Sequence, residues 1–219
     1  MKLEIYNTLR ERIIYLEYEP GSILNEQNLA NEFKVSRTTL RAALFRLEWE
    51  HLIKILPRTG IQVTELELNR IINVYQARLE IEDAIGRIAA KRFTQAHTER
   101  LTQLLTTCDP LLNNKNAKAL TAIDFEIKDI FYEAVGNPYL KETAQRWYAL
   151  TFRLWYFNLM KMDDDNWNKE VLSVKDELTA LSAVLSEKHP IQVGQTRKAH
   201  LRNHLERIRT TFFSLSDDF

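Results

Sequence analysis

Apolar residues recur three or four positions apart from Ile5 to Leu16, and this period predicts an amphipathic helix over residues 3–17. The Pro-Gly pair in "EPGS" should end that helix, because neither residue continues a helical backbone well. A second, shorter helix is predicted in "NEQNLANEF", with Asn25 as its N-cap.

Ser36 precedes the third helical pattern and is a good N-cap, because its hydroxyl can accept a hydrogen bond from a backbone N–H that the helix leaves unpaired. Two short runs rich in β-branched residues follow, "LIKIL" and "IQVTE". They are separated by "PRTG", which predicts a hairpin with a loop of about four residues.

From residue 67 onward the strand pattern disappears and long amphipathic segments follow one another. The predicted helices cover residues 67–93, 95–113, 117–135, 138–161, 168–187 and 191–213. Short polar breaks separate them, and helices of this length with short connections favour an antiparallel bundle. The change of pattern predicts two domains, over residues 1–66 and 67–219.

The overall composition says little about function, whereas the local distribution of charge is informative. The 219 residues are 45% hydrophobic, which supports a real core, and 30 basic residues balance 30 acidic ones. Between Lys34 and Arg58, however, six basic residues face only Glu48 and Glu50, a local excess of four positive charges. The single cysteine, Cys108, cannot form an internal disulfide. With no long apolar run and no signal-peptide pattern, we expect a cytoplasmic protein without a membrane partner.

The third predicted helix has one apolar and one basic face. On a helical wheel Arg37 and Arg41 lie about 40° apart with Thr38 beside them, while the leucines fall on another side. Two arginines and a hydroxyl near the positive end of a helix suit DNA phosphates, and arginine can also bind guanine with two hydrogen bonds.

Two arginines alone would equally fit the solvated face of an ordinary surface helix. The preceding helix, the tight turn and the basic hairpin tip at Arg58 favour DNA binding instead. We therefore predict a mainly α fold: an N-terminal winged helix-turn-helix followed by an all-α antiparallel helical bundle.

The stretch "GSILNEQNLANEFKVSRTTLRAALFRLEWEHLI", with the later "RTGIQV", resembles the N-terminal domain of GntR-type bacterial transcription regulators. The resemblance implies that operator DNA is contacted by Ser36, Arg37, Thr38, Thr39, Arg41 and Gly60. Two positions depart from the family pattern. Gln27 stands where some relatives have a DNA-contacting arginine, and His51 stands where glycine is usual, which puts the left-handed turn there in question.

The segments "VYQARLEIEDAIGRIAAKR" and "DFEIKDIFYEAVGN" resemble the all-helical (FCD-type) effector domain of the FadR-like branch of this family. The resemblance implies a pocket for a small molecule, often an organic acid, and in many members a divalent metal held by an aspartate and three histidines. Of these ligands Asp124 and His200 are present, whereas Lys128 and Glu177 occupy two histidine positions. A protonated lysine cannot ligate a cation.

We expect Lys128 to take the place of the metal as a fixed positive charge, balanced by Asp124 and Glu177. A ligand carboxylate would bind Lys128 with help from Arg78, in a pocket without a cofactor. Among the many aromatic residues of this region, Tyr148 and Trp155 are the candidates for lining the pocket.

Two other interpretations stay open. His200 and His204 lie four residues apart on one helix face and could hold zinc or nickel with Asp124 or Glu177. Alternatively, Asp124 and Lys128 form an ordinary surface pair one helical turn apart, and His204 is a surface histidine.

These features predict a ligand-responsive DNA-binding transcription regulator, a repressor by the family's habit, that acts as a homodimer on a near-palindromic operator. The alternatives are a constitutive regulator whose effector pocket has degenerated and a metal-dependent sensor that uses His200. An enzyme is not expected, because no Gly-rich phosphate loop, nucleophile elbow or paired-carboxylate arrangement stands out.

Overall fold

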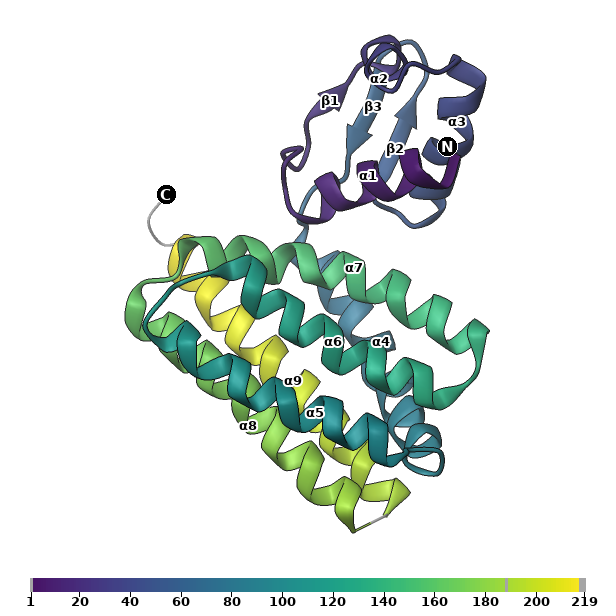
Figure 1. Cartoon of the computed structure of the whole chain (residues 1–219). Helices are drawn as coiled ribbons and strands as arrows, with labels where there is room; N and C mark the ends of the chain where they lie inside the picture. The colour runs from purple at the N-terminus through teal and green to yellow at the C-terminus, as the bar shows by residue number, and fades with distance from the viewer. Residues whose placement is uncertain (1, 188, 217–219) are drawn as a thin grey trace. The chain divides into compact units, whose positions relative to one another are not determined.

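The computed structural model describes the backbone of residues 2–187 and 189–216 and the side chains through residue 210. The chain divides into two compact units (Figure 1). One comprises the N-terminal 71 residues together with residues 149–154, and the other comprises the remaining helices. Within the described residues, no helix combines the length and the apolar character needed to cross a membrane.

The N-terminal unit is a three-helix domain with a small sheet, as predicted for a winged helix-turn-helix (Figure 1). Its elements are α1 (Lys2–Ile14), β1 (Ile23–Leu24), α2 (Glu26–Glu32), α3 (Arg37–Trp49), β2 (Ile53–Leu56) and β3 (Gly60–Val63). The sheet is antiparallel in the order β1-β3-β2, with Ile55 opposite Ile61 in the hairpin. Strand β1 was not predicted, because two residues are too short for an alternating pattern.

Local side-chain chemistry fixes the ends of the helices in this unit. Asn25 caps α2 and Ser36 caps α3, as predicted, and the Ser36 hydroxyl accepts a hydrogen bond from the Thr39 N–H at 3.2 Å. His51 does adopt the left-handed turn, with φ +63. The His51 and Leu52 N–H groups bond the carbonyls of Glu48 and Leu47, so α3 ends in a Schellman motif without glycine.

The leucines predicted on the inner face of α3 form the core of this unit. Leu40, Leu44 and Leu47 are fully buried, and they pack with residues of α1, β2 and β3. Gly60 begins β3 at φ +134, where an added Cβ would lie 2.7 Å from the Leu24 carbonyl oxygen. Glycine is therefore required at this position, because a side chain would collide with the neighbouring backbone.

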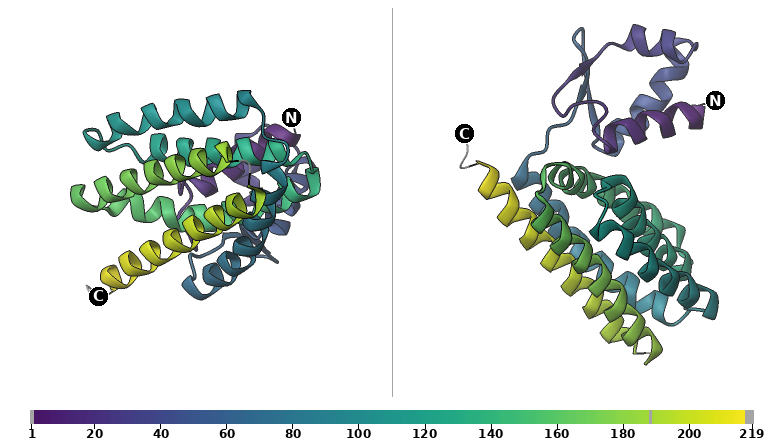
Figure 2. Two further views of the ribbon diagram at one scale, coloured as in Figure 1. Left: turned by 90° about the horizontal axis from the view of Figure 1, so that it is seen from below. Right: turned by 60° about the vertical axis from the view of Figure 1, so that its left-hand side comes forward.

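Within the described residues, the second unit is built from six long helices and one 3-10 turn, apart from residues 149–154 of α7, which belong to the first unit. Its elements are α4 (Leu68–Ala90), α5 (Gln95–Cys108), η1 (Asp109–Leu112), α6 (Ala117–Val135), α7 (Pro138–Lys161), α8 (Asp164–Ser186) and α9 (Pro190–Ser216). Helix α5 lies beside both α6 and α8, and α8 runs along α9 (Figures 1 and 2). The bundle prediction is confirmed, and α6 and α7 have the predicted bounds.

The predicted start of α8 at residue 168 was wrong. The helix begins at Asp164, because the Asp163 side chain accepts a hydrogen bond from the Asn166 N–H at 2.7 Å and caps it there. Trp167 is buried in the first turn, and its indole N–H donates to the Leu111 carbonyl at 2.7 Å.

Helices α4 and α9 approach each other closely at two glycines. A Cβ on Gly86 would lie 2.8 Å from the Gly194 Cα, and a Cβ on Gly194 would lie 2.6 Å from the Asp83 carbonyl oxygen. Only residues without a side chain allow this backbone contact. It brings Glu82 on α4 within reach of Arg197 on α9.

Candidate DNA interface and effector pocket

The residues predicted to contact DNA cluster at the N-terminal end of α3 and at the tip of the hairpin. Arg37, Thr38 and Arg41 are exposed on α3, and Arg58 is exposed at the tip with φ +65. Arg41 donates from Nε and Nη2 to the two carboxylate oxygens of Glu26, at 2.8 and 3.1 Å. The Arg41 side chain is 57% exposed, so this ion pair is weak and DNA phosphates can compete for it.

Gln27 lies beside this surface and contacts one of its arginines. Its side-chain oxygen accepts a hydrogen bond from Arg37 Nε at 2.7 Å, while its nitrogen donates to Asn31 at 2.8 Å. Gln27 therefore orients Arg37 across the turn between α2 and α3. The structure brings the predicted arginines and hydroxyls together on one surface.

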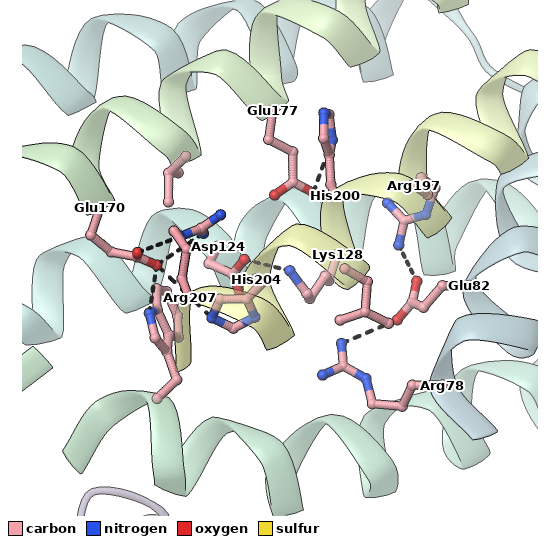
Figure 3. A pocket seen from close by; sticks show the side chains of 13 residues that line it. Arg78, Glu82, Asp124, Lys128, Glu170, Glu177, Arg197, His200, His204 and Arg207 are labelled. Carbon is pink, nitrogen blue, oxygen red and sulfur yellow. Dashed lines mark hydrogen bonds and ion pairs between the residues drawn. The ribbon is translucent and has the colours of Figure 1, made fainter. Parts of the chain in front are cut away.

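The bundle contains a pocket between α4, α6, α7, α8 and α9 (Figure 3). Its space not filled by atoms is about 420 Å³, part of which is open to solvent. The lining residues are Arg78, Glu82, Asp124, Lys128, Trp155, Glu170, Val174, Glu177, Arg197, His200, Leu201, His204 and Arg207. Four of these side chains are cationic and four are carboxylates, so the pocket is polar and its formal charges balance.

Glu82 organises one end of the pocket. It pairs with Arg197 and with Arg78, the latter at 3.5 Å, and it accepts a hydrogen bond from the Tyr132 hydroxyl at 3.0 Å. Burial alone would raise the pKa of Glu82, but Arg197, Arg78 and Lys128 outweigh it and lower the pKa to about 2. Glu82 is therefore a buried carboxylate that is ionised at physiological pH.

Asp124 and Lys128 face each other in the middle of the pocket (Figure 3). The two residues are only 6% and 9% exposed, and Lys128 Nζ donates to Asp124 Oδ1. The Tyr148 hydroxyl donates to the other carboxylate oxygen at 2.7 Å. The alternative interpretation of an ordinary surface pair was therefore wrong, because the packing of α6 in the bundle buries both side chains.

Glu170 organises the other end of the pocket. It accepts hydrogen bonds from Trp155 Nε1 at 2.9 Å and from Arg207 Nε and Nη2 at 2.8 and 3.2 Å. Burial would raise the pKa of Glu170, but the hydrogen bonds from Arg207 prevail and lower it. This carboxylate is also held ionised.

The two pocket histidines lie one turn apart on α9 and are both short of hydrogen bonds. His204 Nδ1 lies 3.3 Å from the Tyr75 hydroxyl, and its Nε2 lies 3.9 Å from Glu170. Burial lowers the pKa of His204 to about 3 and also lowers the pKa of His200, so both rings are neutral at physiological pH. The interpretation of His204 as a surface histidine was wrong, because α9 turns this side chain into the pocket.

The metal site implied by the family resemblance does not fit these residues. Asp124 is already paired with Lys128 and Tyr148, and a lysine ammonium beside it would repel a cation. Among the residues that the structure describes, no three His, Cys, Asp or Glu side chains are grouped to hold a metal ion. His200 and His204 alone would leave a metal without the ligands it needs.

The structure brings together nearly all of the predicted effector residues. Arg78, Asp124, Lys128, Trp155, Glu177 and His200 line the pocket, and Tyr148 reaches it through Asp124. Four charged lining residues were missed: Glu82, Glu170, Arg197 and Arg207. Helical spacing could have found them, because each lies three, four or seven residues from a predicted site residue on the same helix.

Comparison with known proteins agrees with both units. Residues 1–63 match the family described as bacterial regulatory proteins of the gntR family, and residues 73–207 match the FCD domain. The chain belongs to the GntR family. This GntR protein is thus a transcription regulator with a DNA-binding domain and an FCD effector-binding domain.

Curated relatives agree with the assignment, and a solved structure shares the fold. The chain is 25% identical to the HTH-type transcriptional repressor RspR of Escherichia coli, over 99% of this chain and 92% of the relative. It is 29% identical to the gluconate operon transcriptional repressor of Bacillus subtilis, over 61% and 54% of the two chains. The solved structure of Escherichia coli McbR/YncC has the same fold, with a TM-score of 0.82, 16% identity and coverage of 96% and 98%.

Proposed function

We propose that this GntR regulator is a cytoplasmic repressor that binds a near-palindromic operator as a homodimer. Residues 1–66 would hold the DNA, with the N-terminal end of α3 in the major groove and the hairpin tip at the minor groove. The proposed contacts are Ser36, Arg37, Thr38, Thr39, Arg41, Arg58 and Gly60. The surface formed by Arg37 and Arg41 supports this placement, because their donors lie exposed and are held only by weak surface partners.

We further propose that residues 67–219 bind a small organic acid in the pocket of the bundle. The observation that carries this proposal is Lys128, a buried ammonium that lines the charged pocket and is paired there with a single carboxylate. A ligand carboxylate can take over part of the role of Asp124, because it offers Lys128 the same charge-assisted hydrogen bond. Arg78, Tyr148, Trp155, Glu177 and His200 would complete the site.

We expect binding to rearrange the paired side chains of the pocket. Lys128 donates to Asp124 inside the pocket, so a ligand carboxylate that binds Lys128 in place of Asp124 has to part this pair. A ligand shifts a protein between conformations only by its differential affinity for them. The opened pocket would be the state that the ligand stabilises, and it would bind the operator less tightly.

The names of relatives agree with this proposal. RspR is named a transcriptional repressor, and the relative from Bacillus subtilis is named the repressor of a gluconate operon. Gluconate is a small organic acid, which is the class of effector proposed here for the pocket.

The test is fluorescence anisotropy with labelled DNA from upstream of the gene, in the presence and absence of short-chain hydroxy and keto acids that include gluconate. We expect salt-sensitive, sequence-specific binding by the wild type, weakened by at least one acid. Lys128→Ala should abolish the response to the acid and leave DNA binding intact. Lys141→Ala is the matched control, because Lys141 pairs with Asp129 at 3.0 Å outside the pocket.

The results separate the candidate functions. DNA binding that no acid changes would point to a constitutive regulator with a degenerate pocket. An acid response that survives in the Lys128→Ala variant would remove Lys128 from the site. An absence of specific DNA binding at several salt concentrations would contradict the proposed placement of α3.

A further inference from the structure

The pocket has equal numbers of cationic and anionic side chains, but these side chains are not equally well paired. Three of the four lining carboxylates each accept at least two hydrogen bonds or ion pairs from the protein: Glu82, Asp124 and Glu170. Glu177 is different. Its only partner among the described residues is His200 Nδ1 at 3.9 Å, which is beyond hydrogen-bond distance.

The imidazole of His200 cannot neutralise Glu177. Burial lowers the pKa of His200, so the ring carries no charge at physiological pH. His200 Nδ1 itself is buried without a hydrogen bond. Glu177 thus has no hydrogen-bond donor or cation within bonding distance among the described residues, and such a carboxylate favours an ammonium group.

Arg197 has the opposite property, because some of its donors lack acceptors. Its side chain is 4% exposed, its Nη2 contacts Glu82, and its guanidinium carbon lies 4.0 Å from the centroid of the Phe131 ring. Its Nε and Nη1 are buried and have no hydrogen-bond partner among the described residues. Buried guanidinium donors are costly to leave unpaired, and a carboxylate oxygen can accept a charge-assisted hydrogen bond from Nη1.

The two unpaired positions are close together. Arg197 and His200 lie three residues apart on α9, so their side chains emerge about one helical turn, roughly 5 Å, from each other. Both line the same pocket, together with Glu177 from α8 and Lys128 from α6 (Figure 3). A small molecule can therefore reach the donors of Arg197 and the carboxylate of Glu177 at once.

Neither a simple acid nor a simple amine satisfies both positions. An acid would pair with Arg197 and Lys128, but it would add a fifth negative charge to a balanced pocket and leave Glu177 without a cation. An amine would pair with Glu177 and leave the Arg197 donors empty. A ligand with both groups adds no net charge and supplies both missing partners.

We propose that the effector of this pocket is a short amino acid bound as a zwitterion. Its carboxylate binds Arg197 Nη1 and Lys128, and its ammonium binds Glu177 beside His200. This inference rests on the proposed effector function and names the chemical class of the ligand.

The test is isothermal titration calorimetry on the full chain with matched ligands. The zwitterions are alanine, β-alanine and 4-aminobutyrate, each compared with the acid that lacks its amino group and the amine that lacks its carboxylate. We expect at least one zwitterion to bind tenfold or more tightly than both of its partners. Glu177→Gln keeps the size of the side chain and removes its charge, so it should reduce that preference to less than threefold.

Glu177 is suited to this variant because no tight ion pair depends on it, whereas changes at Arg197 would also disturb Glu82. The matched control is Glu206→Gln on the exposed side of α9, which should keep the full preference. An acid that binds as tightly as its zwitterion would overturn this inference and leave the organic-acid site standing. A preference that survives in Glu177→Gln would also overturn it. Binding by none of the compounds would overturn this inference, and the hydroxy and keto acids of the DNA-binding test would still decide the organic-acid proposal.

Discussion

The two units of this regulator treat their charged side chains in opposite ways. In the N-terminal unit, Arg41 meets Glu26 at the surface, where the arginine side chain is 57% exposed. In the helical unit, Arg197 meets Glu82 with both side chains less than 5% exposed. Both contacts are arginine–glutamate pairs, yet water screens the first and is excluded from the second.

This difference matches what each unit has to bind. A screened surface pair contributes little to stability, so Arg41 can exchange Glu26 for a DNA phosphate or base at little cost. If one partner of a buried pair were removed, the other charge would stay buried without compensation, which is costly. The charges in the pocket can therefore be rearranged only by a ligand that replaces the contacts it breaks.

Removal of one buried partner gives the largest expected effect. Glu82→Gln leaves Arg78 and Arg197 without their common anion, and breaking a buried ion pair in this way costs about 3–5 kcal/mol of unfolding free energy. Urea unfolding followed by circular dichroism measures this cost. Glu26→Gln is the surface counterpart and should leave stability unchanged within error; equal losses in both variants would contradict the comparison.

Acid should destabilise the helical unit before its carboxylates titrate. The pKa of His204 falls from about 6.5 when unfolded to about 3 when folded, so between these values the unfolded chain binds a proton that the folded chain refuses. Stability therefore falls as the pH is lowered from 6.5, by about 2 kcal/mol at pH 5 for this one group. His200 acts in the same direction, because burial lowers its pKa as well.

Urea midpoints measured at pH 7 and pH 5 test this window. Below pH 4.5 Glu82 adds its own loss, because its folded pKa of about 2 lies below the unfolded value. His204→Gln should reduce the difference between pH 7 and pH 5, whereas His189→Gln, at an exposed histidine, should leave it as in the wild type. An unchanged pH dependence in His204→Gln would show that His204 is not buried in its neutral form.

On the surface side of the comparison, Arg41→Ala should affect DNA and not the fold. If Arg41 binds a guanine, the variant should lose roughly tenfold to a hundredfold in affinity for the operator, with the urea midpoint unchanged. Arg87→Ala is the control, because Arg87 forms a similar exposed pair with Asp83 on α4. Undiminished operator binding by Arg41→Ala would move the recognition surface away from this part of α3.

The smallest predicted effect concerns the backbone at the end of α3. His51 has φ +63, a conformation in which glycine avoids the steric cost that other residues bear. His51→Gly should therefore raise the unfolding free energy by about 1 kcal/mol, and His51→Val should lower it, because a β-branched residue tolerates this region poorly. Thermal unfolding of the two variants would show the opposite signs, and a less stable glycine variant would contradict this account.

The sequence by itself determined the features that depend on neighbours along the chain. The caps at Asn25 and Ser36 and the bounds of α6 and α7 follow from local signals, since a cap or a terminating glycine acts within one helical turn. In the same way, the helical periods and the N-terminal motif predicted the fold class and the basic surface of α3.

Only the tertiary structure decided which charges are buried and which side chains meet. Strand β1 exists because it pairs with β3, far along the chain, and the buried Trp167 donates its indole N–H to a carbonyl of η1. Glu82 meets Arg197 across 115 residues, through a close helix contact that local sequence does not specify. The pocket residues could be proposed singly from helix faces, but their pairing depends on packing, because burial is a property of the whole bundle and not of any one helix.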